Sequence, residues 1–175
     1  QVYIDMLTDS GTSAMSSTQW AGIMTGDESY AGSKSFFRLE KTIQELMGFP
    51  FIQPTHQGRA ADFIMSQLYA KNGGYILGNM HFDSFKGHAE IAGSTPVDLI
   101  IEEGRTANSN PHPFKGNMDI EKLKDFIATH DTSEIPLIII TVTCNGNGGQ
   151  PVSMENIRTV ASIAKAHNIP LMIDA

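Results

Sequence analysis

The chain has 175 residues, of which 41% are hydrophobic and 18% charged, so it is long enough to form one globular α/β domain with a buried core. The formal net charge of −7, with acidic and basic residues interspersed, argues against a nucleic-acid-binding or anionic-membrane surface. A single cysteine, no signal-peptide pattern and no apolar run of about 18 residues argue against export, disulfides or a membrane span. A reducing cytoplasm is therefore expected.

The first 33 residues read as a loop-rich segment, and residues 34–175 read as the α/β core of a single fragment. Ser16–Thr18 can cap a helix over residues 19–24, where Trp20 is expected to pack. Ser33 can cap a helix over residues 34–47, which Gly48 would end. The chain starts without Met and stops at the end of a predicted strand, so we expect an internal piece of a longer protein.

The segment from Pro54 to Arg59 precedes an amphipathic run over residues 60–69. If that run is helical, Gln57, Gly58 and Arg59 occupy its first turn, where unpaired backbone N–H groups and the helix dipole favour an anion. Arg59 adds a fixed charge with forked donors, so the pattern suggests a phosphate site. The alternative is a plain loop with a solvated cation.

Further along, residues 75–79, 95–101, 135–143 and 169–173 are predicted strands, and helices are predicted from Asp119 through residue 127 and over residues 154–167. The run 135–143 is nearly continuous and β-branched, which is typical of a parallel strand buried on both faces. These elements predict an α/β fold with a mainly parallel sheet flanked by helices. Ligands then gather at the carboxyl ends of the strands.

Several polar or aromatic side chains follow these predicted strands directly: Phe82, Asp83, Asn145 and Asp174. The chain has no G-x-G-x-x-G fingerprint and no His/Cys pair with metal-ligand spacing, so neither a dinucleotide site nor a metal cage is expected. Cys144 has no evident base nearby and is interpreted as a small buried hydrophobe. His56 and His81 are interpreted as structural.

Four separated segments, residues 7–12, 26–30, 55–59 and 148–153, together resemble the β-eliminating lyases, the tryptophan indole-lyase and tyrosine phenol-lyase family. The resemblance runs from end to end. It implies the large domain of an aspartate-aminotransferase-type fold and the cofactor pyridoxal 5′-phosphate (PLP). Another PLP enzyme of this fold, such as an aminotransferase or aldolase, and a non-enzymatic relative serving as a binding module remain alternatives.

The resemblance also implies roles for the cofactor residues. Gln57, Gly58 and Arg59 would hold the phosphate, and Phe82 would stack on the pyridine ring. Asn145 would lie beside the ring oxygen and the substrate carboxylate. Asp174 would pair with the pyridine nitrogen and would keep it protonated, so that the ring can accept electrons.

Further implied roles concern the substrate and a cation. Thr8, Ser10, Gly11 and Asn145 would bind the amino acid. Tyr30 would protonate the leaving group, and it could do so in the active site of a neighbouring subunit. Glu28, with the Gly11 carbonyl, would bind an activating K⁺ ion, which suits oxygen ligands. A dimer-based tetramer is the assembly that the resemblance implies.

Asp83 bears on the substrate, because in this family an acid after the stacking Phe is typical of the indole-lyases. An acid there could accept the indole N–H or assist protonation of the indole carbon, so L-tryptophan is expected. Residues 19–22 instead follow the phenol-lyase pattern, which keeps L-tyrosine open. The cofactor-binding lysine and the substrate-binding arginine are expected after Asp174, so we expect this piece alone to be inactive.

Overall fold

The computed structural model describes residues 15–27, 32–70, 72–106 and 111–175. The chain divides into two compact units, Gln1–Pro54 and Thr55–Ala175, which are described separately. Residues 34–54 belong to the first unit, whose described part contains helices and no strand.

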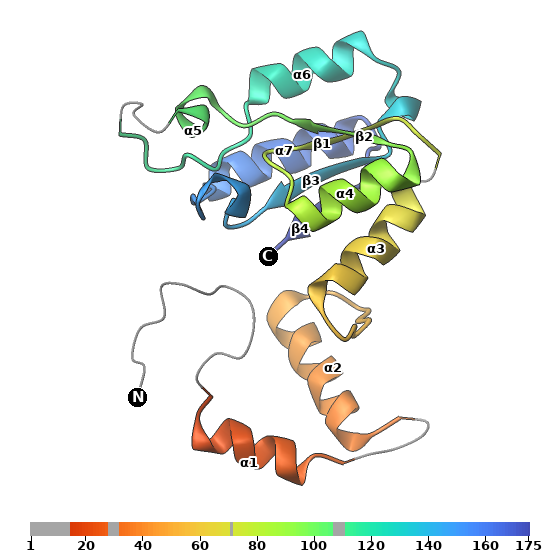
Figure 1. Ribbon diagram of the computed structural model, residues 1–175, viewed down its shortest axis with the longest axis vertical. Helices are drawn as coiled ribbons and strands as arrows, with labels where there is room; N and C mark the ends of the chain where they lie inside the picture. Colours follow the sequence, from red (N-terminus) through yellow and green to blue (C-terminus); the bar gives the residue numbers. More distant parts are fainter. Residues whose placement is uncertain (1–14, 28–31, 71, 107–110) are drawn as a thin grey trace. The chain divides into compact units, whose positions relative to one another are not determined.

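Two capped helices make up the described part of the first unit, α1 (Ser17–Thr25) and α2 (Lys34–Met47) (Figure 1). Ser16 and Gln19 form a reciprocal capping box at the start of α1. The Ser33 hydroxyl caps α2 as predicted, and Gly48 ends α2 in the left-handed conformation. Neither helix has a buried residue, and Trp20, which was expected to pack, is 51% exposed.

A four-stranded parallel sheet organises the second unit, with strand order β2-β1-β3-β4. The strands are β1 (Tyr75–Gly78), β2 (Thr95–Asp98), β3 (Leu137–Thr141) and β4 (Leu171–Asp174). The helices are α3 (Gly58–Tyr69), α4 (Asp83–Ala92), α5 (Glu102–Arg105), α6 (Ile120–Thr129) and α7 (Met154–Ala166), with 3₁₀ turns at Thr132–Glu134 and Asn145–Asn147. The predicted α/β fold with a parallel sheet is confirmed.

Helices cover both faces of this sheet (Figure 1). Side chains of α6 and α7 pack on one face with Leu77, Ile138 and Ile140. Side chains of α3 and α4 pack on the other face with Ile76 and Ile139. Strand β3 is buried along its whole length, as its β-branched run predicted. In the described part of the chain, no helix is both long and apolar enough to span a lipid bilayer.

All four strands are shorter than their sequence patterns, β2 and β3 by the most. The β2 strand ends at Asp98, because the chain then turns so that Ile100 can bridge Met118 in antiparallel fashion. The β3 strand begins at Leu137, separated by two residues from the 3₁₀ turn at Thr132–Glu134, and ends at Thr141. The carboxyl ends of neighbouring strands are level with one another, since Gly78 pairs with Asp98 and Thr141 pairs with Asp174.

Asn79, the residue after β1, ties the carboxyl ends of β1 and β3 together. It is fully buried, its Nδ2 donates to the carbonyl oxygens of Gly116 (2.9 Å) and Thr141 (3.0 Å), and its Oδ1 accepts from the Thr141 N–H (2.9 Å). We expect Asn79→Ala to lower the free energy of unfolding by about 3 kcal/mol, because it leaves these backbone groups buried and unpaired. Urea titration would measure this loss, and an unchanged midpoint would contradict it.

Candidate active site

The first turn of α3 has the features of an anion site. Gln57 is the N-cap in an extended conformation, and its side chain makes no capping hydrogen bond. Gly58 is the first helical residue, and a Cβ atom there would meet no atom within 4 Å, so the space beside it is open. Arg59 is exposed, and none of the ion pairs among the described residues involves it. The turn therefore presents free donors and a cation outward.

The turn between β1 and α4 carries the aromatic candidate and one of the acidic candidates. Phe82 is half-buried and is the N-cap of α4, although its side chain cannot cap. Asp83 is exposed and is the first helical residue, where a carboxylate is favoured by the helix dipole. The side chain of Asp83 is thus free to meet a ligand at the carboxyl edge of the sheet.

Asp174 is the last residue of β4 and is half-buried. Burial, and then the negative charge of Asp62, raise the pKa of its carboxyl. Asp62 lies on α3, one turn after Gly58, and its carboxylate accepts a hydrogen bond from Ser84 in the first turn of α4. Asp62 therefore joins the starts of α3 and α4 beside Asp174. Sequence reasoning missed it, although its spacing of three residues from Arg59 puts both on the first turns of one helix.

Asn145 lies in the 3₁₀ turn after β3 and is exposed. The next residue, Gly146, packs on the turn after β1, because a Cβ atom there would lie 3.1 Å from Met80 Sδ and 3.4 Å from the His81 carbonyl oxygen. Cys144, just before this turn, is buried, and burial raises its thiol pKa to about 11. A neutral thiol is a poor nucleophile.

The structure thus brings four predicted segments to the carboxyl edge of one sheet: the start of α3, the turn with Phe82 and Asp83, the turn with Asn145, and Asp174. The other candidates, Thr8, Ser10, Gly11, Glu28 and Tyr30, lie outside the described residues. Among the described residues, no group of three or more His, Cys, Asp or Glu side chains could hold a metal ion.

Two buried polar atoms at this edge have no partner within the described residues: the Thr141 hydroxyl and His81 Nε2. His81 makes a hydrogen bond through its other ring nitrogen to Asp98, with Nδ1 2.7 Å from Oδ1. Because Asp98 ends β2 and Thr141 ends β3, these polar groups flank the end of β1. Sequence reasoning placed His81 near the site and interpreted it as structural, but gave no role to Asp98 or Thr141.

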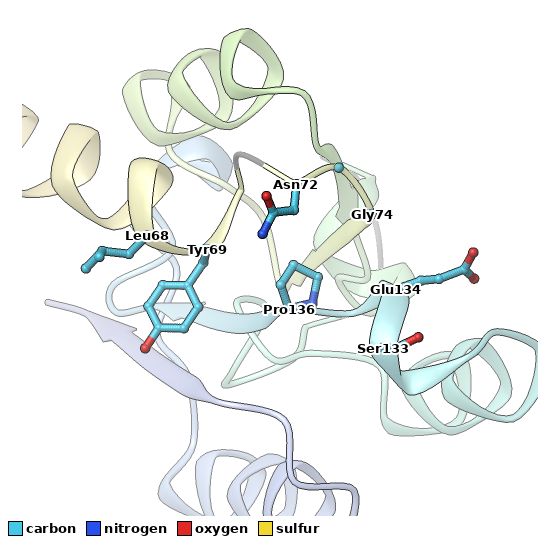
Figure 2. Close-up of a pocket in the computed structure, with 8 residues that line it drawn as sticks. Leu68, Tyr69, Asn72, Gly74, Ser133, Glu134 and Pro136 are labelled. Atoms are coloured by element: carbon cyan, nitrogen blue, oxygen red, sulfur yellow. The ribbon is translucent and has the colours of Figure 1, made fainter.

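A pocket of about 340 Å³ lies at the opposite edge of the sheet, shown in Figure 2. Gly74 and Pro136 line it just before β1 and β3, together with Leu68 and Tyr69 from the last turn of α3. Among the described residues that line it, only Glu134 carries a charge, and its carboxylate would repel an anion. The chemistry therefore favours the carboxyl edge over this pocket as an anion site.

Comparisons with known proteins show which family this chain is similar to. A family model described as "Beta-eliminating lyase" matches residues 5–175. The chain is 53% identical over 174 residues to a tyrosine phenol-lyase from Nostoc punctiforme, of which it covers 37%. It is also 53% identical over 173 residues to a tryptophanase from Rhodobacter capsulatus, of which it covers 38%. Each alignment includes 99% of this chain, so the chain spans less than two fifths of these relatives' length.

Solved structures with low sequence identity share the fold. An alanine aminotransferase from Pyrococcus furiosus superimposes with a TM-score of 0.65 at 17% identity, covering 88% of this chain and 38% of that one. A PLP-bound C-S lyase from Staphylococcus hominis gives a TM-score of 0.61 at 16% identity, covering 90% of this chain and 39% of that one.

Proposed function

Because the chain belongs to the β-eliminating lyase family, we propose that the longer protein containing it is a PLP-dependent lyase that eliminates the side chain of an aromatic L-amino acid. One observation at the site supports the proposal most directly. Asp62 lies three residues after Arg59 on α3, and its negative charge acts on Asp174. A cation for a phosphate and a carboxylate for a ring nitrogen therefore both have Asp62 as a neighbour.

The residues at this edge fit PLP. Gln57, Gly58 and Arg59 would hold the phosphate through backbone N–H groups and the guanidinium. Phe82 would cover the ring, and Asp174 would pair with the ring nitrogen. When bound, PLP supplies an electron-withdrawing ring that stabilises negative charge on the substrate α-carbon. The raised pKa of Asp174 supports this role, because a cationic partner would stabilise the ionised form of its half-buried carboxylate.

The remaining candidates would act on the substrate. We propose that Thr8, Ser10, Gly11 and Asn145 bind its amino-acid part and that Tyr30 gives a proton to the departing aryl carbon. With L-tryptophan, the substrate and one water would give indole, pyruvate and ammonia. Asp83 supports the choice of tryptophan, because its exposed carboxylate can accept the indole N–H.

L-Tyrosine is the second candidate substrate, with phenol as the leaving group. The two relatives named above act on different substrates according to their names, yet each is 53% identical to this chain. Overall identity therefore favours neither substrate, and the choice rests on Asp83.

We expect Asp83→Thr to lower kcat/KM for indole release from L-tryptophan by roughly tenfold to a hundredfold in the full-length protein, because a hydrogen bond to a charged group is lost. Indole and phenol release from the two amino acids would be measured side by side. Glu90→Gln, which removes an exposed carboxylate from the same helix, is the matched control and should leave both rates unchanged. If the wild type releases phenol and no indole, the tryptophan proposal fails and the elimination proposal stands.

Three further properties are proposed from the family resemblance. Glu28 and the Gly11 carbonyl would bind an activating K⁺ ion, and the full-length protein would assemble as a dimer-based tetramer. The single cysteine supports a cytoplasmic location, since exported proteins more often use disulfides.

A further inference from the structure

His81 is buried and tightly confined at the carboxyl edge. Its ring lies flat on Gly78, because a Cβ atom on Gly78 would come within 2.8 to 3.1 Å of three ring atoms. The ring also stacks on Phe85, with centroids 6.1 Å apart and planes 11° apart. Only glycine at position 78 leaves room for this ring.

Asp98 fixes His81 at two points. One carboxylate oxygen, Oδ1, accepts from the His81 backbone N–H at 2.9 Å and lies 2.7 Å from Nδ1. The Lys86 ammonium lies 3.9 Å from the other oxygen. Burial raises the pKa of Asp98, but the hydrogen bonds from His81 outweigh it, so the pKa lies below its ordinary value. The Asp98 carboxylate therefore stays ionised. It contacts the turn before α4 through His81 and contacts α4 itself through Lys86.

The start of α4 needs this support. Phe82 occupies the N-cap position and offers no side-chain oxygen to the first turn of the helix. The Phe82 carbonyl oxygen accepts a hydrogen bond from the Lys86 N–H. Phe82 is therefore held by its backbone and by no side-chain hydrogen bond. The residue directly before it, His81, is held by its side chain through the hydrogen bond to Asp98.

We infer that the buried His81 and the half-buried Asp98 form a positioning device that sets the orientation of Phe82, and through it the aromatic face that meets the cofactor. This inference rests on the proposed function for the identity of that ligand. His81 acts through its Nδ1–H and the shape of its ring, since Nε2 has no partner among the described residues.

Three substitutions separate a hydrogen-bonding role from a packing role. His81→Asn keeps a donor near the position of Nδ1, His81→Phe keeps the flat ring but has no donor, and His81→Gln places its donor nearer to Nε2. In the full-length protein, we expect His81→Phe and His81→Gln to weaken PLP binding roughly tenfold and to change the circular dichroism of the bound cofactor. We expect His81→Asn to restore binding to within about threefold of the wild type.

The matched control is His130→Phe. His130 also stacks on a phenylalanine, with ring centroids 4.0 Å apart, and also bonds through Nδ1, but it lies beside Tyr75 at the amino end of β1. This control should leave the cofactor spectrum and affinity unchanged. Amide hydrogen exchange of a peptide covering residues 80–85, measured without PLP, gives a readout that needs no ligand. Exchange should be faster in His81→Phe and return towards wild type in His81→Asn.

The inference is overturned if His81→Phe binds PLP with wild-type affinity and spectrum, or if His81→Asn is as impaired as His81→Phe. A wild-type protein that binds no PLP would contradict the proposed function and the ligand part of this inference. The exchange measurement would then still decide whether the pair orders the turn, because unchanged exchange in His81→Phe would overturn that part too.

Discussion

Replacing Asp174 with asparagine in the full-length protein is expected to lower kcat/KM for amino-acid elimination by roughly a hundredfold to a thousandfold. Asparagine fills the same space but cannot hold a proton on a ring nitrogen by charge. Product release at saturating PLP would measure the effect. The matched control is Asp125→Asn, which removes an exposed carboxylate from α6. This helix packs on the face of the sheet opposite to α3 and α4. Wild-type activity of Asp174→Asn would remove this residue from the proposed mechanism.

The same substitution should stabilise the protein when no cofactor is bound. The folded-state pKa of Asp174 is raised, so its ionised form is less favourable in the folded state than in the unfolded state. This penalty is absent below the unfolded pKa of about 3.9, and it is fully present above the folded pKa. Asp174→Asn should therefore raise the melting temperature of the cofactor-free protein at neutral pH, and the gain should vanish in acid.

Replacing Arg59 is the second large expected effect. We expect Arg59→Ala to raise the dissociation constant for PLP by roughly tenfold to a hundredfold, because a charge-assisted contact to the phosphate is lost. Arg59→Lys should be intermediate, since an ammonium keeps the charge but not the forked geometry. Fluorescence titration of the cofactor-free protein with PLP would give these constants.

Folding should be little affected by this substitution, because Arg59 is exposed and takes part in none of the ion pairs among the described residues. The matched control is Arg158→Ala, which removes an exposed arginine from α7 on the other side of the sheet. An unchanged PLP affinity in Arg59→Ala would contradict a phosphate site at the start of α3.

Local sequence signals predicted much of the fold. The β-branched run over residues 135–143 marked the buried central strand, and Ser33, Asp119 and Ser153 each cap the helix that they were expected to cap. These features depend on residues close together in the chain, so they can be recognised without tertiary contacts.

Features that depend on distant residues could not be predicted in this way. His81 and Asp98 are 17 residues apart, and their contact depends on the pairing of β1 with β2. Asp62 meets Ser84 across 22 residues, because α3 and α4 pack on one face of the sheet. Strand lengths failed for the same reason: β2 ends early because Ile100 turns to bridge Met118. Gly78 was the one local signal that could have pointed to His81, because only a residue without a side chain leaves space for the His81 ring.

The central claim is PLP-dependent elimination at this sheet edge, and pyruvate release tests it most directly. The full-length protein, with K⁺ present, would be given L-tryptophan or L-tyrosine before and after PLP is added. We predict pyruvate in equal amount to indole or phenol, only when PLP is present, and much less with Asp174→Asn. No pyruvate from either amino acid with PLP bound would contradict the claim.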